Sequence, residues 1–249
     1  MTLADFFRKN PRAGIAFSGG TDSAYLLWAA RKAGADITAY YVRTLFQPRF
    51  EYEDARRLAE ELSVPLRVVP VDILAEPGVA ANPPDRCYHC KRRLFSAILE
   101  AAAADGYSLV LDGTNASDDA ADRPGMRALR ELSVRSPLRE CGLTKDEIRR
   151  RSQEAGLFTW NKPAYACLAT RIPAGIPLQE DLLARTERAE SYLSDLGFSD
   201  LRVRLYGGAA RIQLPAEQLP RLLEHREAIL TALGRDYNAV LLDLEVRHG

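Results

Sequence analysis

The feature that most constrains the fold is the regular alternation of strand-like and helix-like segments in the N-terminal third of the chain. Residues 13–17, 36–43 and 66–73 are short apolar segments, and residues 22–34 and 51–63 between them have helical spacing. A strand–helix–strand–helix–strand order requires a parallel sheet with helices on its faces. The N-terminal region is therefore predicted to be an α/β domain.

The pattern continues with less regularity after this region. A fourth strand leads into a polar loop over residues 108–119, and a short fifth strand is expected within residues 131–138. Thr144 and Glu147 have the spacing of a capping box, which predicts that a helix begins there. Residues 157–178 contain three prolines without clear periodicity, so we expect a long loop of the kind kept for function.

The C-terminal part has a different organisation. A helix is expected over residues 180–198, a β-hairpin around Gly207 and Gly208, another helix over 218–234 and a last strand within 238–246. These segments predict a smaller α+β domain. We place the α/β domain at residues 1–172 and the smaller domain, expected to serve substrate binding and oligomerisation, at 173–249.

A glycine-rich turn joins the first strand to the first of these helices, in the sequence FSGGTDSAYLL. Glycines at 19 and 20 let a phosphate approach the backbone, and the helix start supplies N–H groups and a positive dipole end. Asp22 suits either a helix cap or a metal ion that bridges phosphates. Hydroxyl groups that could donate to an anion belong to Ser18, Thr21 and Ser23. No Walker lysine and no dinucleotide fingerprint is present, so the turn predicts a different kind of anion site, with a plain helix-capping turn as the alternative.

Cysteines form a second group of candidate residues. Cys87 and Cys90 form a C-x-x-C pair, which is compatible with half of a metal site, a redox pair, ligands of an iron–sulfur cluster or two unconnected thiols. Cys167 lies in the long loop near Lys162 and Arg171, and neighbouring cations favour the thiolate that a nucleophile or a metal ligand needs. Cys141 is expected to be structural.

Bulk composition excludes several functions. Lys plus Arg and Asp plus Glu both count 34, so the net charge is zero and a general nucleic-acid-binding surface is not expected. The sequence has no apolar run long enough for a membrane span and no signal-peptide core, so we expect a cytoplasmic protein with reduced thiols.

SGGTDS resembles the PP-loop of the N-type ATP pyrophosphatases, in which it cradles the leaving pyrophosphate, usually with magnesium. Segments from "DGTNASDDAADRPG" through "GLFTWNKPAYACLATRIPAG" to "LRVRLYGGAARIQ" extend this resemblance to the LarE family over nearly the whole chain. The resemblance implies an ATP-dependent sulfur transferase that adenylates a carboxylate of pyridinium-3,5-dicarboxylate mononucleotide and converts it to a thiocarboxylate. This chemistry belongs to the biosynthesis of the nickel-pincer nucleotide cofactor of lactate racemase. The expected cofactors are ATP, Mg²⁺ and, in one form of the family, a [4Fe–4S] cluster.

The resemblance also implies roles for particular residues. Cys167 matches the cysteine that gives up its own sulfur in the sacrificial form, and Cys87, Cys90 and Cys167 together match the ligands of the cluster form, which we favour. Asp22 would also contact metal, and the nucleotide would be bound by Ser18, Gly19, Gly20, Asp22, Ser23, Gly113, Thr114, Arg123 and Arg135. The alternative for the two arginines is a surface salt bridge. The residues that match the substrate-phosphate or metal site are Glu190, Arg202 and Arg204.

Two other functions remain open from the sequence. One is a different PP-loop enzyme, such as a tRNA thiolation enzyme, although no dedicated RNA-binding domain is visible. The other is a non-enzymatic nucleotide-binding or iron–sulfur protein. With the favoured function we expect a small nucleotide substrate, a homo-oligomer and functional partners in nickel-pincer cofactor assembly.

Overall fold

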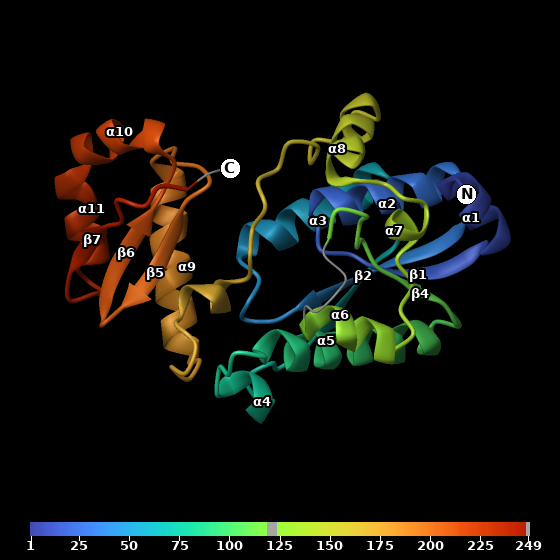
Figure 1. Ribbon diagram of the computed structural model, residues 1–249, viewed down its shortest axis with the longest axis horizontal. Coiled ribbons are helices and arrows are strands. Elements are labelled where there is room, and N and C mark those ends of the chain that lie inside the picture. Colours follow the sequence, from blue (N-terminus) through green and yellow to red (C-terminus); the bar gives the residue numbers. More distant parts are fainter. Residues whose placement is uncertain (119–123, 248–249) are drawn as a thin grey trace. The chain divides into compact units, whose positions relative to one another are not determined.

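A computed structural model describes residues 1–118 and 124–247, and it divides the chain into two compact units. Unit 1 contains Met1–Val79 and Asp85–Lys162. Unit 2 contains Ala80–Pro84 and the chain from Pro163 onward. Each unit has its own sheet (Figure 1).

Unit 1 is built on a four-stranded sheet in the order β3-β2-β1-β4. All three pairings are parallel, as the alternation of segments predicts. The strands are β1 (Arg12–Ala16), β2 (Asp36–Arg43), β3 (Leu66–Pro70) and β4 (Val110–Leu111). The fifth strand expected within 131–138 is wrong: this segment reaches β4 through a single parallel bridge between Leu111 and Arg135, because Pro137 begins a short helix directly afterwards.

Helices cover both faces of this sheet. On one face, side chains of β1 and β2 pack against α1 (Leu3–Lys9), α2 (Thr21–Lys32), α3 (Arg49–Glu61), α7 (Pro137–Glu140) and α8 (Lys145–Glu154). On the opposite face, Tyr40 and Val110 pack against α5 (Arg86–Ala104), which contacts α6 (Pro124–Glu131) (Figure 1). The short helix α4 (Pro77–Ala80) precedes α5. Burial on both faces explains the runs of apolar residues in the middle of β1 and β2.

Unit 2 is the smaller α+β domain that the sequence predicts. Its sheet has the order β5-β6-β7, formed by β5 (Arg202–Tyr206), β6 (Ala209–Gln213) and β7 (Val240–Leu242). β5 and β6 are the predicted hairpin, with Gly207 and Gly208 both at positive φ in the turn. β7 pairs parallel to β6.

The helices of unit 2 depart from prediction at one place. α9 (Glu180–Asp195) and the 3₁₀ turn η1 (Leu168–Arg171) pack on β5. The single helix expected over 218–234 is wrong, because the segment forms two helices that meet at His225. They are α10 (Leu219–Glu224), which follows the 3₁₀ turn η2 (Ala216–Gln218), and α11 (Arg226–Leu233). The side chain of Asn82 donates to the carbonyls of Pro173 and Ile176, which fastens residues 80–84 to the loop after Cys167. Of the helices among the described residues, none is long and apolar enough to cross a membrane.

Candidate functional site

The glycine-rich corner lies between β1 and α2, where the sequence predicts it. Gly20 is the N-cap of α2, and Gly19 has a positive φ of 72°. A Cβ added at Gly19 would lie 3.1 Å from the Cβ of Ala55 and 3.2 Å from the carbonyl oxygen of Glu51, both on α3. Glycine is therefore required at position 19 by backbone conformation and by the close approach of α3.

Two serine hydroxyls of the corner contact each other. Ser18 Oγ and Ser23 Oγ are 3.1 Å apart, and Ser23 Oγ also donates to the carbonyl of Gly20 at 3.1 Å. The expectation that Thr21 presents a hydroxyl to an anion is wrong, because Thr21 Oγ1 is buried and donates to the carbonyl of Thr159 at 2.7 Å. Ser18 and Ser23 thus shape the corner, and Thr21 ties it to the rest of unit 1.

Asp22 lies in the first turn of α2. The capping alternative is wrong, since no side chain among the described residues caps this helix and the N-cap residue is Gly20. Its Oδ2 accepts a hydrogen bond from Nζ of Lys145 at 2.7 Å. Its Oδ1 is buried and has no hydrogen-bond partner among the described residues. An unsatisfied buried carboxylate oxygen is costly in a finished site, so Asp22 is suited to an additional ligand.

The end of β4 adjoins the corner. A Cβ added at Gly113 would lie 2.9 Å from the backbone nitrogen of Ser23, so the strand end contacts the first turn of α2. Thr114 is buried and donates to Asp112, which also accepts from Ser136 Oγ at 2.6 Å. The structure therefore brings Gly113 beside the PP-loop residues, as open α/β sheets do with the carboxyl ends of their strands.

Of the two arginines expected to contact phosphate, the structure describes Arg135. Arg123 lies outside the described residues. Arg135 donates to both carboxylate oxygens of Glu140, donates to Asn10 Oδ1 at 3.3 Å and lies over the ring of Phe6. The hydrogen bond to Glu140 raises the pKa of Arg135 above its ordinary value. These contacts correspond to the salt-bridge alternative.

In unit 2, Cys167 is the N-cap residue of η1. Its carbonyl accepts from the backbone nitrogen of Thr170 at 2.9 Å and from Thr170 Oγ1 at 2.8 Å. Nη1 of Arg171 donates to the carbonyl of the preceding residue, Ala166, at 2.8 Å. The backbone on both sides of the Cys167 thiol is therefore held by hydrogen bonds.

Glu190 is the centre of a buried hydrogen-bond network. Its carboxylate accepts from Nε of Arg171 at 2.7 Å, from Tyr165 Oη at 2.6 Å and from the backbone nitrogen of Val203 at 2.8 Å. Burial would lower the pKa of Arg171, whose side chain is 0% exposed, but the hydrogen bond and charge of Glu190 raise it. The Glu190 carboxylate on α9 thus joins Tyr165 and Arg171 of the Cys167 region to Val203 of β5.

Arg202 and Arg204 lie on β5, and both donate to the Cys167 loop. Nη2 of Arg202 donates to the carbonyl of Ala164 at 2.6 Å, and Nη1 of Arg204 donates to that of Thr170 at 2.9 Å. Burial and the nearby Arg171 cation lower the pKa of Arg202 to about 10 and also lower that of Arg204. Burial and the neighbouring cation thus both disfavour the charged form of these two guanidinium groups.

Cys87 and Cys90 lie near the start of α5, three positions apart, so both thiols are on one side of that helix. They belong to unit 1, whereas Cys167 belongs to unit 2. Within residues 1–118 and 124–247 no group of three His, Cys, Asp or Glu side chains is gathered as a metal site. Cys141 packs against the core of unit 1, and burial raises its pKa, in agreement with a structural role.

The sequence argument missed Lys145. This residue begins α8, directly after its N-cap Thr144, and contacts Asp22, which is 123 residues away in the sequence. A signal existed, because a lysine in the first turn of a helix opposes the helix dipole. Lys162 also reaches the corner: its Nζ donates to Asp54 at 2.6 Å and to the carbonyl of Gly19 at 3.4 Å.

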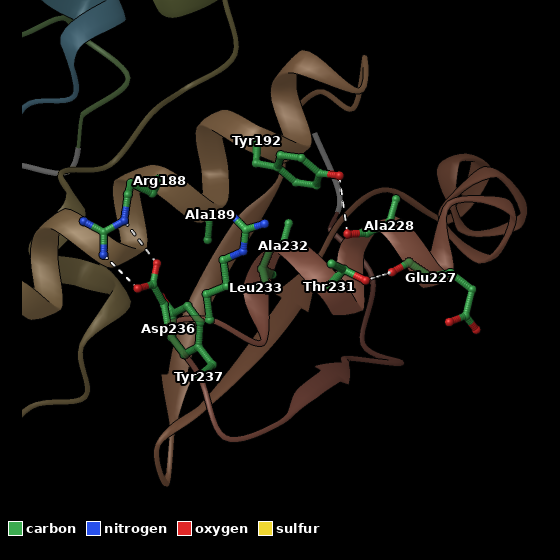
Figure 2. Close-up of a pocket in the computed structure, with 11 residues that line it drawn as sticks. Arg188, Ala189, Tyr192, Glu227, Ala228, Thr231, Ala232, Leu233, Asp236 and Tyr237 are labelled. Atoms are coloured by element: carbon green, nitrogen blue, oxygen red, sulfur yellow. Dashed lines mark hydrogen bonds and ion pairs between the residues drawn. The ribbon is translucent and has the colours of Figure 1, made fainter.

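A separate cavity of about 730 Å³ lies between α9 and α11 (Figure 2). Two polar contacts are made among its lining residues: Arg188 donates to Asp236, and Tyr192 Oη donates to the carbonyl of Ala228. None of the residues predicted for the site lines it. The cavity is therefore distinct from the site that the sequence predicts.

Comparison with known proteins places the chain among sulfur-handling PP-loop enzymes. The family described as queuosine biosynthesis protein QueC matches residues 12–83, which include the PP-loop. An uncharacterized protein of Synechocystis sp. is 38% identical over 98% of this chain and 92% of its own length. The pyridinium-3,5-bisthiocarboxylic acid mononucleotide synthase of Lactiplantibacillus plantarum is 36% identical over 98% of this chain and 89% of its own length.

More distant relatives include the tRNA-specific 2-thiouridylase MnmA 1 of Clostridium botulinum, which is 27% identical over 59% of this chain and 51% of its own length. The likeness to the thiouridylase covers part of the chain only, whereas the likeness to the mononucleotide synthase covers both units. Identity at this level over nearly the full length of both proteins means that the chain belongs to the LarE family of PP-loop sulfur transferases.

Proposed function

We propose that the protein is an ATP-dependent sulfur transferase that converts carboxylates of pyridinium-3,5-dicarboxylate mononucleotide into thiocarboxylates. The observation that carries this proposal is the similarity, over 98% of the chain, to the pyridinium-3,5-bisthiocarboxylic acid mononucleotide synthase. In this function the protein contributes to the nickel-pincer nucleotide cofactor of lactate racemase. It would work in the cytoplasm as a homo-oligomer, with the other proteins of that assembly as functional partners.

The PP-loop corner supports the first half of the reaction. A carboxylate is a poor electrophile, so its oxygen attacks the α-phosphorus of ATP, which forms an acyl adenylate and releases pyrophosphate. N–H groups at the start of α2, with Gly19 and Gly20 lacking side chains, suit the binding of the pyrophosphate. Mg²⁺ is compatible with the donor set, because Asp22 Oδ1 is a buried carboxylate oxygen without a hydrogen-bond partner among the described residues. When bound, Mg²⁺ would offset phosphate charge there.

The arginine cluster supports recognition of the substrate's phosphate. Arg202 is buried and Arg204 is half-buried, and their pKa values are lowered by burial and by the neighbouring charge of Arg171. A bound phosphate would place negative charge beside these cations, and guanidinium groups bind phosphate with paired N–H donors. Glu190 already accepts hydrogen bonds from Arg171, Tyr165 and Val203, so its part in this proposal is to hold Arg171 and Tyr165 beside β5.

Cys167 supports the second half, the transfer of sulfur. In the sacrificial route its thiolate attacks the acyl adenylate carbon and AMP leaves, which gives a thioester. Loss of the Cα proton then breaks the Cβ–S bond and leaves dehydroalanine on the protein and a thiocarboxylate on the product. In the route that we favour, Cys87, Cys90 and Cys167 would hold a [4Fe–4S] cluster, and an additional sulfide bound to it would be the nucleophile for the same displacement. The paired thiols near the start of α5 suit two of these ligands.

The test is pyrophosphate release by protein purified and reconstituted without oxygen. Release that depends on the pyridinium dicarboxylate nucleotide, with thiocarboxylate formed, supports the proposal; release absent under these conditions, or tight tRNA binding at moderate salt, contradicts it. The visible spectrum and the protein mass before and after turnover identify the sulfur source. A brown protein of unchanged mass indicates the cluster, and loss of one hydrogen sulfide at Cys167 indicates sacrifice.

A further inference from the structure

The PP-loop corner contains no basic residue of its own, although its proposed ligand is strongly anionic. From Phe17 to Leu27 the ionisable side chains are those of Asp22 and Tyr25, and Asp22 adds negative charge. The backbone N–H groups and dipole of α2 provide roughly half a positive charge. This is less than the charge of a pyrophosphate group, so a cation from elsewhere in unit 1 would add to the positive charge that a bound Mg²⁺ supplies.

Lys145 is placed to supply this cation. Its Nζ lies 2.7 Å from Asp22 Oδ2, and its side chain is 32% exposed. Its backbone is fixed, because its own N–H donates to Ser117 Oγ at 3.0 Å and the preceding Thr144 caps α8. The loop after β4 and the first turns of α2 and α8 therefore meet around this ammonium group.

Local stability does not explain a lysine at this position. Lys145 is the first residue of α8, where a cation meets the positive end of the helix dipole, which is unfavourable. An ammonium group has three N–H donors. Among the described residues, Asp22 is the acceptor that the structure shows for Nζ of Lys145, which leaves donors for a ligand.

Lys162 makes an instructive comparison. Its Nζ donates both to Asp54 and to the carbonyl of Gly19, and its side chain is 15% exposed. Lys162 is thus more buried and has more protein acceptors than Lys145. Of the two lysines at the corner, Lys145 is the better placed to accept a new anionic partner.

We propose that Lys145 binds the pyrophosphate portion of a nucleoside triphosphate and the inorganic pyrophosphate that leaves. Asp22 holds the ammonium group in place before the ligand arrives, and the remaining donors contact phosphate oxygens. This inference rests on the proposed nucleotide site, since it assigns a residue to the pyrophosphate part of that site. In this role Lys145 contacts the ligand directly and does more than orient Asp22.

The experiment measures binding of inorganic pyrophosphate and of AMP by titration calorimetry to the full-length protein. We expect Lys145→Met to weaken pyrophosphate binding about tenfold or more, because a charged hydrogen bond is lost, and to leave AMP binding within about twofold. Lys145→Arg should recover most of the affinity. Lys9→Met, at an exposed lysine at the end of α1, is the matched control and should bind as the wild type does. Thermal unfolding verifies that each variant is folded.

A double-mutant cycle with Asp22→Asn decides between the two roles. If Lys145 contacts pyrophosphate, Lys145→Met weakens binding by a similar factor in the wild-type and Asp22→Asn backgrounds. If Lys145 acts only through Asp22, it has no effect in the Asp22→Asn background, which overturns the inference. Wild-type protein that binds neither ATP nor pyrophosphate overturns the proposed nucleotide site itself, and the two failures are therefore distinguishable.

Discussion

The PP-loop corner of unit 1 and the Cys167 region of unit 2 are built in opposite ways. In the corner, consecutive residues act mainly through backbone, glycine conformation and short hydroxyl contacts. Around Cys167, charged side chains from separate segments are buried together, with Glu190 accepting from Arg171, Tyr165 and Val203. The comparison shows that one short segment of consecutive residues can form a binding site for a common anionic group. A site for a particular substrate needs side chains that the fold assembles.

The difference also predicts how each region fails. Buried charges depend on their partners, because an uncompensated charge in a protein interior is costly. A backbone-built corner instead depends mainly on space and on short hydrogen bonds of its serine hydroxyls, although Lys145 also pairs with Asp22 there. We therefore expect large losses from charge changes in unit 2 and smaller, steric losses in unit 1.

The largest effect is expected for Glu190→Gln, which leaves Arg171 buried without its carboxylate. Removing one partner of a buried ion pair costs about 3–5 kcal/mol, so the free energy of unfolding of unit 2 should fall by that amount. Urea unfolding followed by a probe in unit 2 measures it. A double variant with Arg171→Met and Glu190→Leu should recover part of the loss. A loss below about 1 kcal/mol for Glu190→Gln would mean that the network is not a charge pair in solution.

The next effect tests the close approach in unit 1. Gly113→Ala places a Cβ 2.9 Å from the backbone nitrogen of Ser23, and backbone cannot move aside as a flexible side chain can. We expect a destabilisation of about 1–3 kcal/mol and weaker ATP binding, since the first turn of α2 is displaced. Gly20→Ala is the matched variant for stability, because Ser18 Oγ, at 3.4 Å, is the one atom of the described residues that its Cβ would meet. Equal unfolding free energies for the two variants would contradict the steric argument.

A smaller effect tests whether the Thr21 hydroxyl, unlike those of Ser18 and Ser23, has a purely structural role. Thr21→Val keeps the side-chain shape but removes the hydrogen bond to the carbonyl of Thr159. The expected loss of unfolding free energy is about 1–2 kcal/mol, since a buried carbonyl loses its donor. Pyrophosphate affinity should change little. If affinity falls while stability is unchanged, the Thr21 hydroxyl faces the ligand after all.

The smallest effect is expected at the exposed ion pair between Arg188 and Asp236 beside the cavity of Figure 2. The hydrogen bond from Arg188 lowers the pKa of Asp236, so the folded state favours the ionised carboxylate. The resulting stability is present at neutral pH and is lost as the pH falls through the lowered pKa. Asp236→Asn should cost about 0.2–1 kcal/mol at neutral pH. Its difference from wild type should vanish well below the ordinary carboxyl pKa of about 3.9; a difference that persists in acid would show that the side chain acts by packing.

Much of unit 1 was predictable because its signals are local. Strand–helix alternation predicted the parallel sheet, and the glycines predicted the turn at 19–20. The fifth strand was not predictable in the same way, since a segment with strand-like residues becomes a single bridge when a proline helix begins directly after it. The break at His225 was equally invisible to helical periodicity, because apolar spacing continues across α10 and α11.

By itself, the sequence determined the α/β unit, the PP-loop corner and the hairpin that bears Arg202 and Arg204. These follow from backbone requirements and periodicity, which neighbouring residues already carry. Only the tertiary structure decided that Thr21 faces inward, that Arg135 pairs with Glu140, and that Lys145 reaches Asp22. The physical reason is that a side chain's partner depends on which distant segment the fold brings within hydrogen-bonding range, and a local pattern contains no record of that distance.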